Sequence, residues 1–208
     1  MRLMARTPAK RARPLARVAE MTRKTKETSV RLQLGLDGKG RGSISTGLPF
    51  LDHMLEALAR HSAFDLSVKA SGDLQVDDHH LVEDVGLVLG SALDQALAAR
   101  KLISRYGWAV VPMDEALVMC AVDLGGRAHL SYQLELSKRI KEFNTELVQE
   151  FLEALVRNAK MNLHLRQLAG RNSHHIIEAA FKALAQALGA AAAPSTRYLG
   201  VPSTKGVL

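Results

Sequence analysis

The sequence predicts an α+β fold in which one β-β-α-β-α unit occurs twice, and three observations lead to this prediction. The expected strands and helices follow the same order in both halves of the 208-residue chain, which is the signature of an internal repeat. The segment His53–Leu58 (HMLEAL) aligns with Glu150–Leu155 (EFLEAL). The pattern His-His-x-x-Glu occurs at His79–Glu83 and again, 95 residues later, at His174–Glu178. Agreement in order, sequence and motif indicates a duplication.

The first repeat is expected to open with two strands that form a β-hairpin. Apolar residues alternate over Val30–Leu36, Asp37–Gly40 supplies a turn, and Gly42–Thr46 leads back. A helix is expected from Pro49, because the apolar residues that follow it recur at helical spacing. The elements that complete the repeat are a strand over 64–68 and a helix from 79 towards 100.

The second repeat is predicted to contain the same elements in the same order. They are strands over 115–123 and 127–135, a helix over 145–157, a strand over 161–168 and a helix over 173–188. The repeats are expected to span about 27–113 and 114–208, and to form one domain of residues 22–208. Apolar residues make up 47% of the chain, which is enough for a sizeable core.

The net charge of +7 is concentrated at the N-terminus, where residues 1–26 hold nine Lys and Arg against one Glu. Such a tail can contact RNA or an anionic surface, or act as a transit peptide. The simpler interpretation is a basic, disordered extension over 1–21, with Met21 as an alternative start. Because the remaining residues are close to neutral, the domain itself is not expected to bind nucleic acid.

The composition excludes a membrane span and a disulfide framework. Cys120 is the single cysteine, which suits a reducing compartment. No apolar run approaches the roughly 18 residues of a membrane helix, and none resembles a secretory signal. We therefore expect a cytoplasmic protein that does not associate with membranes.

The twin motifs predict two metal centres. Adjacent histidines point roughly 100° apart around a helix, so two neighbouring imidazoles serve different centres, each completed by other elements or other subunits. Imidazole and carboxylate without thiolate favour manganese, iron, cobalt or zinc, and the spacing differs from metalloprotease signatures. The duplication adds two equivalent positions to the ligand set. The predicted ligands are His53, His79, His80, Glu83, Glu150, His174, His175 and Glu178. His129 and His164 have no counterpart and are predicted to be core or sheet residues.

Several cations and donors outside the tail can bind a phosphate group. They are Arg105, Arg127, Lys182 and the C-terminal segment Pro202–Gly206, which contains Ser203 and Lys205. Each alone is more often a solvated charge than a ligand, but a Ser-Thr-Lys-Gly segment at the end of a chain is unusual for a purely structural element.

Five segments together resemble the imidazoleglycerol-phosphate dehydratase family: LDHML, HHLVEDVG, PMDEAL, RNSHHIIEAAFKA and PSTKGVL. The resemblance covers about Thr22–Leu208 and implies a duplicated α+β unit with two sheets packed with helices, of the ribosomal protein S5 domain 2-like kind. It also implies a homo-oligomer of 24 subunits with active sites between subunits. The implied reaction of histidine biosynthesis is the dehydration of D-erythro-imidazole-glycerol phosphate, a small-molecule phosphate substrate, to imidazole acetol phosphate. Two manganese ions per active site would hold the substrate imidazole as imidazolate.

The resemblance also implies roles for single residues. It assigns the eight predicted ligands to manganese and places Glu27 against the substrate, where this carboxylate is the candidate acid/base. The residues implied to hold the substrate, chiefly its phosphate, are Arg105, Arg127, Lys182, Ser203 and Lys205. Two positions depart from the common family pattern: Glu150 stands where many relatives have His, and Ala57 where many have Gln.

Two alternatives from other classes predict different behaviour. A two-metal phosphatase would release inorganic phosphate from the substrate, whereas a dehydratase leaves the phosphate in place. A non-catalytic protein, such as a metal-storing shell or an RNA binder that depends on residues 1–26, would show no turnover.

Overall fold

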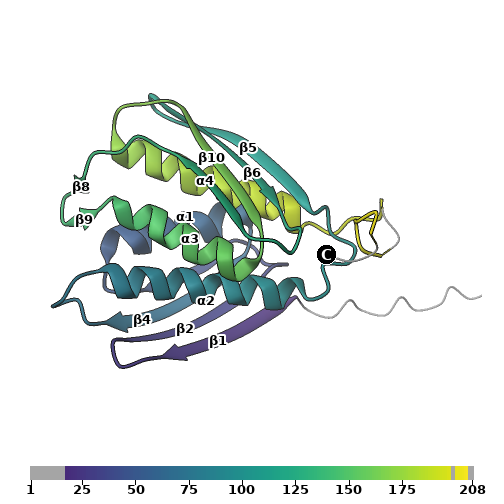
Figure 1. The fold of residues 1–208 in the computed structure, drawn as a ribbon, viewed down its shortest axis with the longest axis horizontal. Coiled ribbons are helices and arrows are strands. Elements are labelled where there is room, and N and C mark those ends of the chain that lie inside the picture. Colours follow the sequence, from purple (N-terminus) through teal and green to yellow (C-terminus); the bar gives the residue numbers. More distant parts are fainter. Residues whose placement is uncertain (1–16, 198–199, 206–208) are drawn as a thin grey trace, which may run out of the picture.

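The computed structural model describes residues 17–197 and 200–205, and it places four helices between two four-stranded sheets (Figure 1). The predicted α+β fold, with two sheets packed against helices, is confirmed. The elements are β1 Val18–Lys24, β2 Thr28–Gly35, β3 Gly42–Ser45, α1 Pro49–Ser62, β4 Asp65–Gly72, α2 His79–Leu97, β5 Tyr106–Met113, β6 Ala116–Asp123, β7 His129–Gln133, β8 Arg139–Ile140, β9 Phe143–Asn144, α3 Glu146–Ala159, β10 Asn162–Ala169 and α4 Ser173–Ala192.

The two sheets have the same strand order, β1-β2-β4-β3 and β5-β6-β10-β7. The predicted hairpin between 30–36 and 42–46 is wrong, because β4 lies between β2 and β3. Val68 of β4 faces Leu32 of antiparallel β2 and Ile44 of parallel β3. A parallel pair needs a crossover, and α1 supplies it between β3 and β4. The turn between β2 and β3 therefore joins two strands that never pair with each other.

The structure also corrects the predicted boundaries of the repeats. Strand β1 pairs with β2 along its whole length, so the expected limit of the extension at residue 21 falls inside a strand. Strand β5 pairs with β6 and belongs to the second repeat, although the prediction assigned residues 106–113 to the first. The repeated unit is therefore β-β-β-α-β-α, running from β1 to α2 and from β5 to α4. Residues 1–16 of the predicted extension lie outside the described residues.

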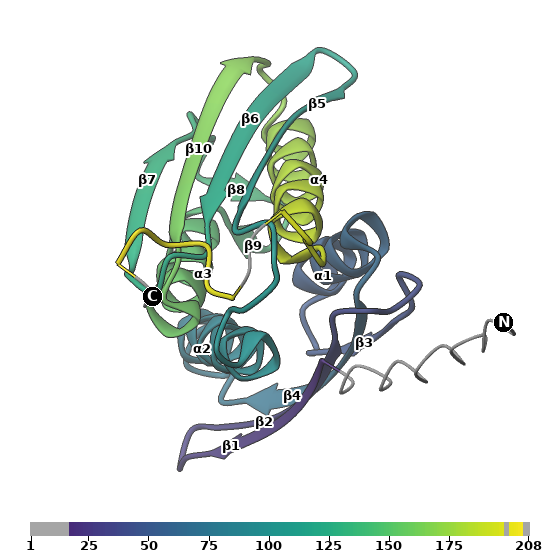
Figure 2. The ribbon, with the colours of Figure 1, turned by 90° about the vertical axis from the view of Figure 1, so that its right-hand side faces the viewer.

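The helices form two packed pairs, α1 with α4 and α2 with α3, which Figure 2 shows between the sheets. The pair α2 and α3 approaches closely because Gly86 has no side chain: a Cβ there would lie 2.6 Å from the carbonyl oxygen of Phe151. Phe151, Leu55, Leu81 and Leu155 are fully buried between the sheets. Burial of each such side chain contributes about 1.5–3 kcal/mol, so the pairing of helices, and with it the place of each motif, is set by the core.

Local sequence fixes where the motif-bearing helices begin. Pro49 occupies the first turn of α1, where its missing N–H is not needed. The side chain of Asn172 accepts a hydrogen bond from the His174 backbone N–H at the start of α4 (3.0 Å), and Asp77 does the same for His79 at the start of α2 (2.9 Å). Both His-His-x-x-Glu motifs thus occupy the first turns of equivalent helices.

No helix in ranges 17–197 and 200–205 has the length and apolar character needed to cross a membrane.

Candidate metal centre

Three predicted ligands from two helices converge at one end of the molecule. His53 comes from α1, and His174 and Glu178 come from the first turns of α4, which packs beside α1. The Glu178 Oε2 atom lies 3.5 Å from His53 Nε2 and 3.3 Å from His174 Nε2. One donor atom from each residue lies within 4.8 Å of the other two. Since α1 belongs to the first repeat and α4 to the second, the cluster joins the two halves.

The donor set suits a divalent metal ion. Two imidazole nitrogens and one carboxylate oxygen, without thiolate, are ligands for manganese, iron, cobalt or zinc. Bonds of roughly 2.0–2.2 Å from a metal to nitrogen and oxygen place neighbouring donors roughly 3–3.5 Å apart, which is the spacing seen around Glu178. Three protein donors leave room for further ligands. The residues present therefore fit a metal ion.

Electrostatics keep Glu178 ionised within the cluster. Partial burial opposes its ionisation, but Lys182 and then His53 outweigh this effect, so the pKa of Glu178 lies below its usual value. Lys182, one turn further along α4, places its ammonium 2.7 Å from Glu178 Oε1. Because Oε2 faces the two histidines, the carboxylate presents one oxygen to Lys182 and the other to the candidate metal position.

The cluster opens into a cleft of ≈ 460 Å³ beside β8 and β9. His53 and His174 form part of its wall, together with the aromatic rings of Phe50 and Phe143. The Phe50 ring lies 5.0 Å from Phe143 and 5.4 Å, edge to face, from the His174 ring. Such aromatic contacts fix the plane of the His174 imidazole. The wall of the cleft therefore combines aromatic rings with imidazole donors.

Within the described residues, the other predicted ligands form no cluster in which donor atoms of three residues lie this close together. His79 and Glu83 lie on α2 and Glu150 on α3, at positions equivalent to His174, Glu178 and His53 in the other helix pair. The close approach of Gly86 to Phe151 brings together the helix segments that carry Glu83 and Glu150. The second helix pair thus carries His and Glu at the three equivalent positions, with Glu150 in place of His53, and each of the three is half-buried.

The second histidine of each motif is instead paired with a carboxylate. His80 Nδ1 lies 3.1 Å from Asp73 Oδ2, and His175 Nδ1 lies 2.7 Å from Glu115 Oε2. The hydrogen bonds that these imidazoles donate to the carboxylates raise the pKa of both imidazoles. In return, His175, followed by backbone N–H groups of residues 171 and 172, lowers the pKa of Glu115 to about 2.

Sequence reasoning missed Asp73 and Glu115, since one looked like a turn residue and the other like the start of a strand. The duplication contained a usable signal: Glu115 directly precedes β6, just as the predicted substrate residue Glu27 directly precedes β2. Glu27 lies in the β1–β2 turn, with its carboxylate 3.9 Å from His80 Nδ1. His129 and His164 are sheet residues as predicted, but they lie on the exposed face of β7 and β10 and not in the core.

Most of the predicted phosphate-binding residues gather near the C-terminal segment. Arg105 pairs with Asp123 (2.7 Å) and donates to the carbonyl of Pro202 (2.7 Å), so it holds the backbone next to Ser203. The carboxylate of Asp123 raises the pKa of Arg105. The Lys205 backbone N–H donates to Ser203 Oγ (3.2 Å), which makes a compact turn. Lys182 is the exception, because it lies beside Glu178.

The metal cluster and the C-terminal segment lie at opposite ends of α4 (Figure 1). Arg105 donates its backbone N–H to the carbonyl of Ala191, near the last residue of α4, whereas His174 lies in its first turn. At a rise of 1.5 Å per residue these positions are about 25 Å apart. Arg127 is exposed in the loop before β7, and its backbone carbonyl accepts a hydrogen bond from the side-chain amide of Asn162 (2.7 Å). Asn162 lies opposite Asp123, the ion-pair partner of Arg105, so Arg127 is at the same end of the molecule as Arg105.

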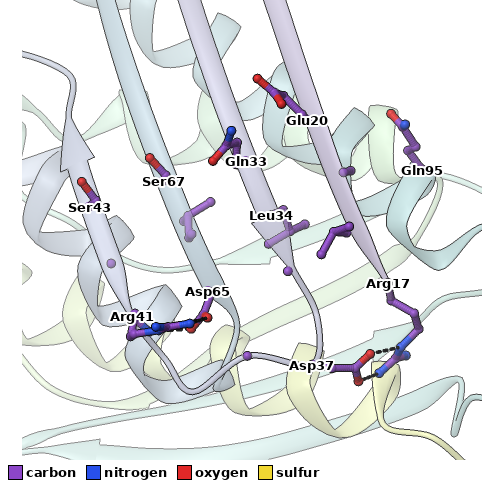
Figure 3. A pocket seen from close by; sticks show the side chains of 16 residues that line it. Arg17, Glu20, Gln33, Leu34, Asp37, Arg41, Ser43, Asp65, Ser67 and Gln95 are labelled. Carbon is purple, nitrogen blue, oxygen red and sulfur yellow. Dashed lines mark hydrogen bonds and ion pairs between the residues drawn. The ribbon is translucent and has the colours of Figure 1, made fainter. Parts of the chain in front are cut away.

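A separate pocket of ≈ 700 Å³ lies at one end of the first sheet and contains none of the predicted site residues (Figure 3). Its charged side chains are all in ion pairs: Arg41 with Asp65 (2.5 Å), Arg17 with Asp37, and Glu20 with Arg31 outside the pocket (2.6 Å). Ion pairs that satisfy each other leave little charge for a phosphate or a metal ion. This pocket therefore offers no support for the predicted chemistry.

The fold and the cluster define a duplicated α+β protein with a histidine–carboxylate cluster that is a candidate metal site. A family model described as imidazoleglycerol-phosphate dehydratase matches residues 46–188. The enzyme of that name from Desulforudis audaxviator is 54% identical over 195 residues, covering 93% of this chain and 99% of the relative. The chloroplastic enzyme from Pisum sativum is 54% identical over 197 residues, covering 94% and 70%.

Solved structures agree with these relatives. Imidazoleglycerol-phosphate dehydratase from Staphylococcus aureus superposes with a TM-score of 0.78 at 38% identity, covering 86% of this chain and 99% of the other. The enzyme from Pyrococcus furiosus gives a TM-score of 0.78 at 39% identity, covering 90% and 100%. The chain belongs to the imidazoleglycerol-phosphate dehydratase family, as its sequence motifs predicted, and is therefore a hydro-lyase.

Proposed function

We propose that this protein dehydrates D-erythro-imidazole-glycerol phosphate to imidazole acetol phosphate, a step of histidine biosynthesis. The observation that carries the proposal is the convergence of His53, His174 and Glu178, from both repeats, in a member of a dehydratase family. The lone Cys120 is buried and suits a reducing compartment, so we propose that the reaction takes place in the cytoplasm.

We propose manganese as the metal, with two ions per active site. His53, His174 and Glu178 would hold one ion, and their counterparts Glu150, His79 and Glu83 would hold the other. His80 and His175 would each complete a set contributed by another copy of the chain. Bound metal would supply electrophilic stabilisation of the imidazolate form of the substrate ring, next to the carbon that loses its proton.

Glu27 is proposed to move that proton. It lies in the three-residue turn between β1 and β2, with a side chain that is 57% exposed. Among the described residues, the ionisable partner within 4.0 Å of its carboxylate is His80, at 3.9 Å, which is beyond hydrogen-bond distance. The carboxylate therefore keeps its lone pairs available for a substrate bound beside His80. General acid–base catalysis of this kind contributes about 10²–10⁴-fold in rate.

Ser203, Lys205, Arg127 and Arg105 are proposed to hold the phosphate. Arg105 is tied to Asp123 and to the carbonyl of Pro202, so its contribution includes positioning Ser203. Lys205 and Arg127 have exposed side chains able to contact a phosphate directly. Binding energy gained at the phosphate, away from the reacting carbons, orients the imidazole ring towards the metal ligands.

The arrangement of the two groups supports a shared active site. A small phosphate ester cannot span about 25 Å, the separation along α4 between the metal cluster and the phosphate-binding segment. A complete site therefore needs the metal ligands of one copy and the phosphate ligands of another. We propose a homo-oligomer with active sites between subunits, of the 24-subunit kind that the sequence resemblance implies.

The test is an assay of the full-length chain with imidazole-glycerol phosphate and manganese. Mass spectrometry should show loss of one water from the substrate, while a colorimetric phosphate assay should detect no free phosphate. Release of phosphate would instead identify a two-metal phosphatase. Absence of both products from a folded, metal-loaded protein would refute the proposal and favour a metal-storing role.

A further inference from the structure

The two repeats allow an internal comparison of two glutamates, Glu27 and Glu115. Each directly precedes an eight-residue strand, β2 or β6, in which buried residues alternate with less buried ones. Each is the last residue of the short turn that follows the edge strand, β1 or β5. The two glutamates therefore occupy equivalent positions, but their surroundings differ.

The difference lies in how each glutamate meets the second histidine of its own motif. In the second repeat, Glu115 Oε2 is 2.7 Å from His175 Nδ1. In the first repeat, Glu27 Oε2 is 3.9 Å from His80 Nδ1, and Asp73 takes the hydrogen bond instead at 3.1 Å. The side chain of Asp73 is only 15% exposed, whereas that of Glu27 is 57% exposed. Each imidazole thus has one close carboxylate on the same ring nitrogen.

The loops that lead into α2 and α4 explain why different carboxylates are used. The loop after β4 begins with Asp73, which reaches back to His80 at the start of α2. The equivalent loop after β10 is shorter and reads Gly170-Arg171-Asn172, without a carboxylate. Glu115 supplies the carboxylate that this loop lacks. Its Oε1 accepts hydrogen bonds from the backbone N–H groups of Arg171 (3.2 Å) and Asn172 (2.8 Å), while its Oε2 faces His175.

We propose that Asp73 and Glu115 are positioning residues that hold the Nδ1–H of His80 and His175, so that each Nε2 is free to bind metal. The proposal rests on the proposed function and extends it in one respect. Because Asp73 serves His80, Glu27 is released for the substrate, whereas its counterpart Glu115 is committed to His175. The duplicated glutamate has therefore acquired two roles, one catalytic and one structural.

The chemistry of imidazole supports this division. A neutral imidazole carries one N–H and one lone pair, and a carboxylate that accepts the N–H fixes both the tautomer and the ring plane. It also makes the opposite nitrogen a better donor to a metal. Losing such an outer partner commonly lowers metal affinity by about 10–100-fold. Raised pKa values of His80 and His175, caused first by Asp73 and Glu115 respectively, agree with these hydrogen bonds.

The experiment measures manganese binding to the full-length chain by electron paramagnetic resonance of free Mn²⁺. Glu115→Gln keeps an oxygen for the backbone N–H groups but removes the charged acceptor of His175. It should weaken one class of site by about 10–100-fold, and Asp73→Asn should weaken the other class to a similar extent. Glu27→Gln should bind manganese as the parent does, although it loses turnover.

Asp114→Asn is the matched control. Asp114 lies next to Glu115, is 72% exposed, and faces the opposite nitrogen, His175 Nε2, at 3.7 Å. It carries the same charge near the same ring but makes no hydrogen bond to Nδ1, so its loss should change affinity by no more than about two-fold. Equal losses in Asp114→Asn and Glu115→Gln would overturn the proposal, because general electrostatics would then explain both.

A second measurement does not depend on the variants folding. Nitrogen NMR of histidine-labelled, metal-free parent protein, at a pH above the imidazole pKa values, reports which ring nitrogen carries the proton. His80 and His175, assigned by substitution, should both be Nδ1–H tautomers; Nε2–H tautomers would overturn the proposal. If the parent binds no manganese or dehydrates no substrate, the proposed function fails instead, and the tautomer result still tests the hydrogen bonds alone.

Discussion

Replacing Gly86 with alanine should separate α2 from α3, destabilise the fold and weaken one metal site. The added Cβ would lie 2.6 Å from the Phe151 carbonyl oxygen and 3.2 Å from the Ala154 Cβ. Ordinary contacts of these atoms begin near 3.5 Å, so the helices would have to move apart by roughly 1 Å. Phe151 and Ala154 are each 1% exposed, so this movement disturbs the core.

The magnitude follows from two opposed effects. Overpacking of a close-packed core costs about 1–3 kcal/mol, and the upper part of this range applies because the atom met at 2.6 Å is backbone and cannot rotate away. Alanine in a helix gains up to about 1 kcal/mol over glycine. The net loss should be about 1–2 kcal/mol, which lowers the Tm of a chain of this size by about 2–8 °C. Glu83 lies one turn before Gly86 and Glu150 directly precedes Phe151, so the same movement should weaken the site that these residues are proposed to form.

The assays are thermal unfolding of metal-free, full-length protein and manganese titration of the same sample. Gly42→Ala is the control, since a Cβ at Gly42 would meet only ordinary contacts at 3.8 Å. Its free energy of unfolding should stay within about 0.5 kcal/mol of the parent. An unchanged Tm in Gly86→Ala, or an equal loss in Gly42→Ala, would refute the packing argument. Loss of stability with both manganese sites intact would refute the placement of Glu83 and Glu150 at a metal.

Three further predictions concern the proposed site. Glu150→Ala should bind less manganese and lose on the order of ten-fold or more in activity, whereas Glu150→His should retain most of its manganese binding and activity. The measurement is the amount of manganese bound per subunit, and binding by Glu150→Ala that equals the parent would contradict the prediction. Glu27→Gln should keep its manganese and assembly state but lose at least about 100-fold in turnover, and near-normal turnover would move the proton transfer to another group. Lys205→Ala should weaken substrate binding by about 1.5–3 kcal/mol, and so raise KM, without changing the metal content. Steady-state kinetics measure this change, and an unchanged KM would exclude the phosphate contact.

Helices and buried strands were predictable from the sequence because their apolar residues recur at the spacing of a helix or of a strand. The prediction of a helix from Pro49, a helix over 173–188 and a strand over 161–168 agrees with α1, α4 and β10 to within a few residues. Strands β1 and β5 escaped prediction because they are edge strands with one exposed face. The charged side chains of β1 made it look like part of the basic extension, although Arg31 and Glu20 pair across β1 and β2 at 2.6 Å.

Strand pairing was not predictable from local pattern, and the false hairpin shows why. A turn between two alternating segments favours pairing of neighbours, but it carries no information about a third strand that arrives later in the chain. In this fold α1 packs against the sheet and returns the chain as β4, which inserts between β2 and β3. The contacts that decide the order, such as Leu32 with Val68, are 36 residues apart and depend on the whole core.

The same contrast applies to the candidate site: its ligands were predictable from local motifs, but the partners of the second histidines are distant in sequence and were not. The two motifs were visible because each places its ligands within one helical turn, and the duplication added His53, which the cluster contains. The partners of the second histidines were not visible, because His175 meets Glu115 across 60 residues of sequence. Histidines and glutamates at helical spacing predict metal ligands from the sequence alone. The carboxylates that orient these histidines lie on strands and loops, and their position depends on the whole fold.

The geometry of α4 links this chemistry to assembly. One helix carries His174 and Glu178 in its first turns, and its last turn supports Arg105, which holds the segment bearing Ser203 and Lys205. The helix between these positions is rigid, so it keeps the proposed metal ligands and the proposed phosphate ligands about 25 Å apart in every copy. We therefore propose that a substrate that needs both sets of ligands binds where the first turns of one α4 meet the end of another. Under this proposal, substrate and metal would favour association of subunits by mass action, because each would be bound by the assembled protein more tightly than by a single chain.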